Sequence, residues 1–219
     1  MLELPAVAVV GGTGHLGAAI ARRLALAGYP IIIGSRDPER AREAAARLSG
    51  ILPTAIRGAS NPQAAREGAI VIVAVPFTFQ AQILADIRSS VGGKIIVDTT
   101  VPLMPPKVMR VQLPPEGSAA QIAQKILGDK VTVVSAFHNV PAHKLATDQE
   151  IDCDVLVFGD DKESCARVID LVKACRLRGL HGGSLANSAA AEAFTSILIS
   201  INKQYSVDGA GIRITGELK

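Results

Sequence analysis

A glycine-rich turn near the start of the sequence joins an apolar run to a helical pattern. The apolar run at residues 6–10 leads into Gly12-x-Gly14-x-x-Gly17, and an alanine-rich pattern with helical spacing continues to Gly28. A strand, a glycine turn and a helix in this order form the site that holds a dinucleotide pyrophosphate. We expect Gly12 to permit the tight turn, Gly14 to let the backbone approach the phosphates, and Gly17 to let the helix pack closely on the strand. A purely structural turn can carry the same glycines, but the patterns on both sides favour a dinucleotide site at the amino end of the helix.

The end of the second predicted strand indicates which dinucleotide is bound. This strand covers residues 30–33, and at its end an NAD-dependent enzyme places an Asp or Glu on the ribose 2′-hydroxyl. Here Ser35 and Arg36 follow instead, with Arg40 about one helical turn later. A hydroxyl and two guanidinium groups can bind a 2′-phosphate through charge-assisted hydrogen bonds, whereas Asp37 is expected to be the N-cap of the next helix. We therefore predict NADP rather than NAD; the alternative is that Arg36 and Arg40 only face water on a charged helix.

Length, charge and composition limit the class of protein. The 219 residues suit one domain, or one large domain with a small appendage, and 48% hydrophobic residues are enough for a sizeable core. Because the formal charge is only +3 and aromatic residues make up 3% of the chain, without any Trp, a nucleic-acid partner is not expected.

Three observations predict a cytoplasmic protein without a membrane span. Cys153, Cys165 and Cys175 are odd in number and lack a C-x-x-C pair, so they are expected to be reduced, mostly buried thiols. The first strand begins almost at once, so no signal peptide is expected. The most apolar long stretch, residues 185–201, carries Glu192 and is interpreted as a buried or interfacial helix. It could form a dimer interface or lie in the core of a monomer.

Strand-like and helix-like segments alternate along the chain, which predicts an α/β fold with a doubly wound parallel sheet. Apolar runs typical of strands lie at residues 6–10, 30–33, 69–75, 94–97, 131–136 and 155–158, with a weaker run at 54–57. Segments with helical spacing lie at residues 15–27, 38–48, 79–91, 118–127 and 162–174.

A proline-rich segment interrupts this alternation. Residues 101–117 contain prolines at positions 102, 105, 106, 114 and 115, which exclude a regular helix or a central strand. Long loops inside compact domains are usually functional, and this one leaves the carboxyl edge of the predicted sheet, where ligands bind. A surface connection that merely crosses between layers explains the segment equally well.

Residues that follow the later strands are candidates for the chemistry. Val75 and Phe77 follow the fourth strand and could lie against the nicotinamide ribose or ring. His138 follows the sixth strand; a lone histidine there is more often structural than catalytic, although this one lies at the predicted cofactor mouth. His143 is expected to begin the next helix and His181 to lie in a turn. None of the histidines has metal-ligand spacing with a Cys or a carboxylate, so no metal is predicted.

The usual acid–base residues for reducing a ketone are missing from the sequence. Tyr29 and Tyr205 are the only tyrosines, and neither is followed four residues later by Lys. The predicted helix after Ser184 also lacks a lysine on its early turns. A hydride acceptor that needs little acid–base help from the protein is therefore favoured.

Longer motifs extend over nearly the whole chain and are more specific than the glycine turn alone. They are Gly11-Gly12-Thr13-Gly14-His15-Leu16-Gly17, Gly34-Ser35-Arg36, Gly117-Ser118-Ala119-Ala120, Ser135-Ala136-Phe137-His138-Asn139-Val140-Pro141-Ala142, Asp152-Cys153-Asp154-Val155, Gly159-Asp160-Asp161 and Gly211-Ile212-Arg213-Ile214. With this combination the chain resembles the NADPH-dependent coenzyme F-420 (F420) reductases, also called F-420:NADP oxidoreductases.

The resemblance implies a Rossmann domain at residues 1–145 and a small C-terminal α/β domain at 146–219 that serves dimerisation and closure of the deazaflavin site. It implies a cytoplasmic homodimer with no membrane partner. The activity it implies is direct hydride transfer between NADPH/NADP and the deazaflavin ring of F420, with the two rings stacked face to face. Such a transfer gains its rate mainly from proximity and orientation, and the cofactors carry the organic chemistry.

The resemblance also implies roles for individual residues. The pyrophosphate would be held by Thr13, Gly14, His15 and Leu16, with Gly12 and Gly17 completing this cofactor-binding turn, and the 2′-phosphate by Ser35, Arg36 and Arg40. Val75, Phe77, Ala81, Val101 and Ala142 would shape the nicotinamide end, and Ser135, His138 and Val140 would face the deazaflavin. Family members often have Lys where Arg40 stands and Trp where Phe77 stands, which changes the contact geometry at both positions.

Two other functions are compatible with the same motifs. One is an NADPH-dependent reductase of another flavin or of a ferric complex, which differs in the ring that the isolated protein prefers. The other is a non-catalytic NADP-sensing regulator, which would have a partner-binding surface and no second pocket for a flat ligand beside the nicotinamide.

Overall fold

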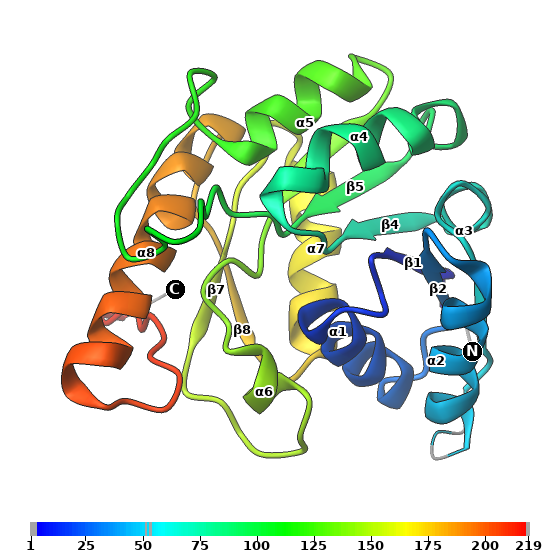
Figure 1. Ribbon diagram of the computed structural model, residues 1–219, viewed down its shortest axis with the longest axis horizontal. Coiled ribbons are helices and arrows are strands. Elements are labelled where there is room, and N and C mark those ends of the chain that lie inside the picture. Colours follow the sequence, from blue (N-terminus) through cyan, green and yellow to red (C-terminus); the bar gives the residue numbers. More distant parts are fainter. Residues whose placement is uncertain (1–3, 51, 53, 218–219) are drawn as a thin grey trace.

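Six parallel strands form the central sheet of the protein (Figure 1). In the computed structural model, which describes residues 4–50, 52 and 54–217, their order is β3-β2-β1-β4-β5-β6. The strands are β1 Val7–Val10, β2 Ile31–Ser35, β3 Ile56–Ser60, β4 Ile70–Val73, β5 Ile95–Asp98 and β6 Thr132–Ser135. Because the chain moves outward from β1 in one direction and then returns to add β4 on its other side, the carboxyl ends of β1 and β4 meet at a topological switch point. The predicted doubly wound α/β fold is confirmed.

Helices cover both faces of this sheet. They are α1 His15–Leu26, α2 Pro38–Ser49, α3 Asn61–Glu67, α4 Phe77–Ile87, α5 Ala119–Leu127, α6 Ala142–Leu145, α7 Lys162–Ala174 and α8 Ser188–Tyr205, with 3-10 turns η1 Arg88–Ser90 and η2 Leu185–Asn187. Alternate strand residues point to opposite faces: Val7 and Val9 of β1 pack with α1, α2 and α7, while Ala8 and Val10 pack with α3, α4 and α5. A sheet covered on both faces needs strands that are apolar throughout, which explains the continuous runs in the sequence.

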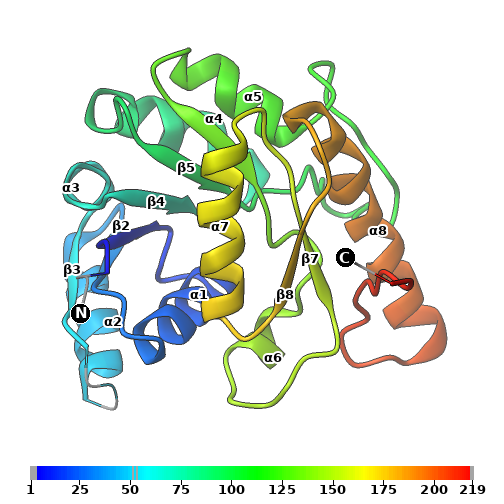
Figure 2. The same cartoon turned by 180° about the vertical axis from the view of Figure 1, so that it is seen from behind.

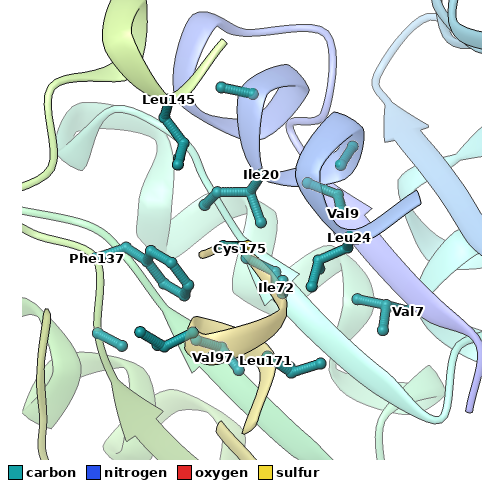
Figure 3. Packing of buried hydrophobic residues seen from close by; sticks show 14 of the residues in the cluster. Val7, Val9, Ile20, Leu24, Ile72, Val97, Phe137, Leu145, Leu171 and Cys175 are labelled. Atoms are coloured by element: carbon teal, nitrogen blue, oxygen red, sulfur yellow. The ribbon is translucent and has the colours of Figure 1, made fainter. Parts of the chain in front are cut away.

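The core on the α1 side also includes the C-terminal part of the chain. Figure 3 shows Ile20 and Leu24 of α1 facing Leu171 and Cys175 of α7, with Phe137 beside them. These side chains are at most 1% exposed. The helix α7 therefore completes the hydrophobic core of the large sheet.

A small second sheet lies beside the first. Its strands β7 (Asp154–Val157) and β8 (Arg178–His181) are parallel, and α7 connects them (Figure 2). One antiparallel bridge joins the two sheets, because the backbone N–H of Ser135 donates to the Phe158 carbonyl at 2.8 Å and Phe158 returns a bond of 2.9 Å. The long helix α8 lies at the end of the molecule opposite α2 in both views (Figures 1 and 2).

The sequence pattern missed two short elements and misplaced others by a few residues. Helix α3 was not expected; Ser60 caps it, since its hydroxyl accepts from the backbone N–H of Gln63. Strand β8 was also missed, so the interpretation of His181 as a turn residue is wrong: it ends β8. Both elements are short and carry few apolar residues, so the hydrophobic period gives no signal. Residues 101–117 contain no helix or strand, as their prolines predict.

None of the described helices is both long and apolar enough to cross a bilayer.

Candidate functional site

The glycine turn after β1 brings backbone, and no side-chain bulk, to the amino end of α1. Gly11 has a φ of +78°. A Cβ atom on Gly17 would lie 2.7 Å from the carbonyl oxygen of Gly11. The expected role of Gly12 needs correction: the left-handed residue of the tight turn is Gly11, whereas Gly12 is required because a Cβ there would lie 2.7 Å from the Val9 carbonyl oxygen. Gly14 is the exposed N-cap of α1, and a Cβ there would meet a single atom within 4 Å, the Gly11 carbonyl oxygen at 3.3 Å, so the outer side of the turn is open for a phosphate.

A hollow of about 420 Å³ lies at the carboxyl ends of β1, β2 and β4. Its walls include three residues that the sequence predicts for the 2′-phosphate, Ser35, Arg36 and Arg40. The other lining residues are Gly11, Thr13, Gly14, Asp37, Asn61, Ala74, Val75, Pro76, Phe79 and Ile83. We call this space the outer hollow.

Both arginines of the outer hollow are exposed, and one of them has an aromatic partner. The Arg36 guanidinium lies over the Phe79 ring, with its Cζ atom 4.8 Å from the ring centroid. Asp37 caps α2 as predicted, since its carboxylate accepts from the backbone N–H of Glu39 at 3.0 Å, and its own N–H donates to the Ser35 hydroxyl at 3.2 Å. Because the Asp37 carboxylate caps α2, the guanidinium groups near Ser35 remain available to bind an anion.

A second hollow of about 510 Å³ continues from the first on the other side of the glycine turn. The two share Gly14, Ala74, Val75 and Pro76. Its other lining residues are His15, Leu16, Phe77, Thr78, Thr99, Thr100, Val101, Leu103, Pro105 and Val108. We call this space the inner hollow. The proline-rich segment supplies its far wall, so the expectation that this loop leaves the carboxyl edge of the sheet is confirmed.

The residues expected to face the deazaflavin lie elsewhere. His138 and Val140 line a third hollow of about 360 Å³, closed by α8 and residues 207–210, and they do not line the inner hollow. Ser135 is fully buried and lines neither; its hydroxyl lies 2.7 Å from Nε2 of His138. Burial lowers the pKa of His138 to about 3, so its ring is neutral at physiological pH.

Four other predicted residues do not line the outer or the inner hollow. Ala81 is exposed on α4, and Ala142 begins α6. Gly12 and Gly17 are buried beneath the turn, where they allow the close packing that the sequence predicts for Gly17.

A buried polar network that the sequence did not indicate supports the inner hollow. Asp98 ends β5, and its Oδ1 accepts from the backbone N–H of Thr100 at 3.0 Å, while the Gln80 amide donates to its Oδ2. Gln80 also donates to the Ala119 carbonyl at 3.0 Å. Burial raises the pKa of Asp98 to about 6. The network therefore fixes the backbone at the start of the loop that lines the inner hollow.

Glu192 of α8 extends this network into the C-terminal part of the chain. Its carboxylate accepts from the backbone N–H groups of Ala119 at 2.6 Å and Ala120 at 3.2 Å, at the amino end of α5. The side chain is 1% exposed, and burial raises its pKa to about 8. The one signal for it in the sequence is a carboxylate inside an otherwise apolar stretch.

Comparisons with known proteins identify the family of this chain. Residues 6–102 match the family described as NADP oxidoreductase, coenzyme F420-dependent. The F420-dependent NADP reductase of Methanocaldococcus jannaschii is 40% identical over 95% of this chain and 97% of its own length. The enzyme of the same name from Methanothermobacter thermautotrophicus is 38% identical over 95% of this chain and 94% of its own. A crystal structure of a candidate F420-dependent NADP reductase from an Arthrobacter species has a TM-score of 0.80 at 24% identity, covering 96% of this chain and 99% of that chain. Because these relatives are 38–40% identical over 95% of the chain, the chain belongs to the F420-dependent NADP reductase family.

Proposed function

We propose that this protein transfers a hydride directly between NADPH/NADP and coenzyme F420. The observation that carries the proposal is the pair of connected hollows on either side of the glycine turn: a positively charged outer one and a largely apolar inner one. Their shared wall at Gly14, Val75 and Pro76 suits one elongated dinucleotide that passes over the amino end of α1.

The residues present fit NADP in the outer hollow. Arg36, Arg40 and Ser35 would bind the 2′-phosphate through charge-assisted hydrogen bonds. The backbone of Thr13 and Gly14 would hold the pyrophosphate, because the first turn of α1 has unpaired N–H groups and a partial positive charge.

The inner hollow would orient the rings rather than react with them. Val75, Phe77 and Val101 offer apolar walls that exclude water from the nicotinamide end. When bound, the nicotinamide and the deazaflavin supply the hydride chemistry, and the chain holds them in reacting geometry. We keep His138 and Val140 as candidates for the deazaflavin side, with Ser135 acting through its contact with His138.

The direct test is to mix the protein with NADPH and F420 and to record the absorbance band of the deazaflavin. The expected result is loss of that band with NADPH and little loss with NADH. Flavin mononucleotide in place of F420 is the control for the related flavin reductases. An unchanged deazaflavin band, or faster bleaching of the flavin, would contradict the proposal.

We also infer that the protein is a homodimer and that residues 146–219 form the dimerisation and closing unit. Phe194 and Ile197 of α8 are 37% and 41% exposed, and an apolar groove runs between α8 and the small sheet. Light scattering after size exclusion should give twice the chain mass for the natural protein and one chain mass for Phe194→Asp. A cytoplasmic location is supported by the free, buried thiols of Cys153, Cys165 and Cys175, and cell fractionation tests it.

A further inference from the structure

The Asn61 side chain is buried at the nucleotide site with its oxygen unpaired. Asn61 begins α3 directly after β3 and is 4% exposed. Its Oδ1 atom is buried without a hydrogen-bond partner in the described part of the chain. Buried amides are nearly always hydrogen-bonded, because an unmade bond leaves the cost of desolvation uncompensated. The free protein therefore retains an amide that needs another polar group.

The position of Asn61 shows which site this polar group would come from. Residue 60 pairs with Ser35 in the register of β2 and β3, so Asn61 follows at the same sheet edge as Arg36. It lines the outer hollow together with both of them. The amide also lies against bare backbone: a Cβ atom on Gly34 would be 3.0 Å from Oδ1.

The outer hollow contains both charged groups and a neutral amide, which suit different parts of a ligand. Two guanidinium groups and the Ser35 hydroxyl supply what a phosphate needs. Asn61 is uncharged and offers both a donor and an acceptor, and rotation of its terminal torsion exchanges the two. Such a group suits the neutral hydroxyls of a ribose or the edge of an adenine ring, which also combine donors and acceptors.

We propose that Asn61 hydrogen-bonds to the adenosine portion of the dinucleotide, and that it sets affinity for the nucleotide without setting the preference for the 2′-phosphate. This inference rests on the proposed binding of NADP. Asn61 is a positioning residue in this role, since it lies at the outer hollow, away from the reacting rings.

The test measures dissociation constants of NADP and NAD by calorimetry for the natural protein and for Asn61→Leu. We expect Asn61→Leu to weaken both nucleotides by the same factor, about three- to tenfold, because one neutral hydrogen bond is lost. Ser90→Ala is the matched control: Ser90 is also buried with an unpaired oxygen, but it lines neither hollow. Its dissociation constants should equal those of the natural protein.

Thermal unfolding separates a binding role from a structural one. Removal of an unpaired buried amide should leave the melting temperature of the free protein unchanged or raise it, while the rise produced by NADP becomes smaller. Asn61→Ala repeats the test with a smaller side chain.

Three outcomes would overturn the inference. Equal affinity of Asn61→Leu and the natural protein would exclude a contact, and a loss confined to NADP would place the amide on the phosphate. Unfolding of both Asn61 variants would show that the amide is needed for the stability of the fold. If the natural protein bound neither nucleotide, the proposed function would fail instead, so the two failures are distinguishable.

Discussion

The outer and inner hollows are built in different ways. The outer hollow takes its charged groups from one short segment, Arg36 to Arg40, and the two arginine side chains are exposed. The inner hollow is assembled from the glycine turn, the start of α4 and the loop after β5, and its support is a buried network around Asp98. The outer hollow can recognise a ligand by charge, whereas the inner one positions it by shape. Substitutions in the outer hollow should therefore change nucleotide affinity, and substitutions in the inner support should change stability.

The largest expected effect is a reversal of charge in the outer hollow. Arg36→Asp should weaken NADPH binding about a hundredfold or more, because an attractive contact with the 2′-phosphate becomes a repulsion. Binding of NADH should change far less. Arg42→Asp is the control, since Arg42 lies on α2, the helix that follows Arg36, pairs with Glu39 and does not line the hollow. Similar losses of NADPH affinity in both variants would mean that the overall positive charge around α2, and not a contact of Arg36, determines binding.

The second prediction separates phosphate contact from helix packing within the glycine turn. Gly17→Ala should lower the free energy of unfolding by about 2–3 kcal/mol, because its Cβ would meet backbone 2.7 Å away. Gly14→Ala should lose much less stability, because its Cβ would meet a single atom, the Gly11 carbonyl oxygen at 3.3 Å, and it should bind NADPH more weakly. Urea denaturation and fluorescence titration measure the two quantities. Equal stability of the two variants would refute this division of roles.

The sequence could predict the outer hollow because recognition there is local. A strand end, Ser35, Arg36 and the N-cap Asp37 are adjacent in the chain, so the pattern and the chemistry coincide. Most strands were also predictable, since a sheet covered on both faces leaves long apolar runs. Asn61 was missed because the weak third strand ends at Ser60 rather than at residue 57, which hid its place at the sheet edge.

The inner support could not be predicted because its members are distant in the chain and individually ordinary. Gln80, Asp98 and Glu192 come from three elements, and only the fold brings them to the amino end of α5. The expected residues Ser135 and His138 were identified by motif, but a motif does not report that the neighbouring β7 connection buries them. Burial and long-range pairing are therefore what the structure adds.

The third prediction tests this inner support through the pH dependence of stability. Between the ordinary pKa of 4.5 and about 8, folded Glu192 keeps a proton that the unfolded chain releases, so the free energy of unfolding falls as pH rises. Glu192→Gln cannot titrate, so its free energy of unfolding should fall less between pH 5 and pH 8, by about 3 kcal/mol. Urea denaturation at both pH values measures it, with the exposed Glu163→Gln as control. A steeper fall in Glu192→Gln would contradict the assignment.

The smallest expected effect concerns the aromatic ring beneath the arginine of the outer hollow. Phe79→Leu removes the surface on which the Arg36 guanidinium lies at 4.8 Å, and an exposed cation–π contact contributes about 0.5–1 kcal/mol. NADPH affinity should therefore fall two- to fivefold, and Phe79→Tyr, which keeps a ring, should restore it. In the Arg36→Asp background Phe79→Leu should have no further effect, because the cation that the ring orients is gone. Additive losses in the double variant would instead mean that Phe79 contacts the nucleotide directly, and the outer hollow would then recognise its ligand by shape as well as by charge.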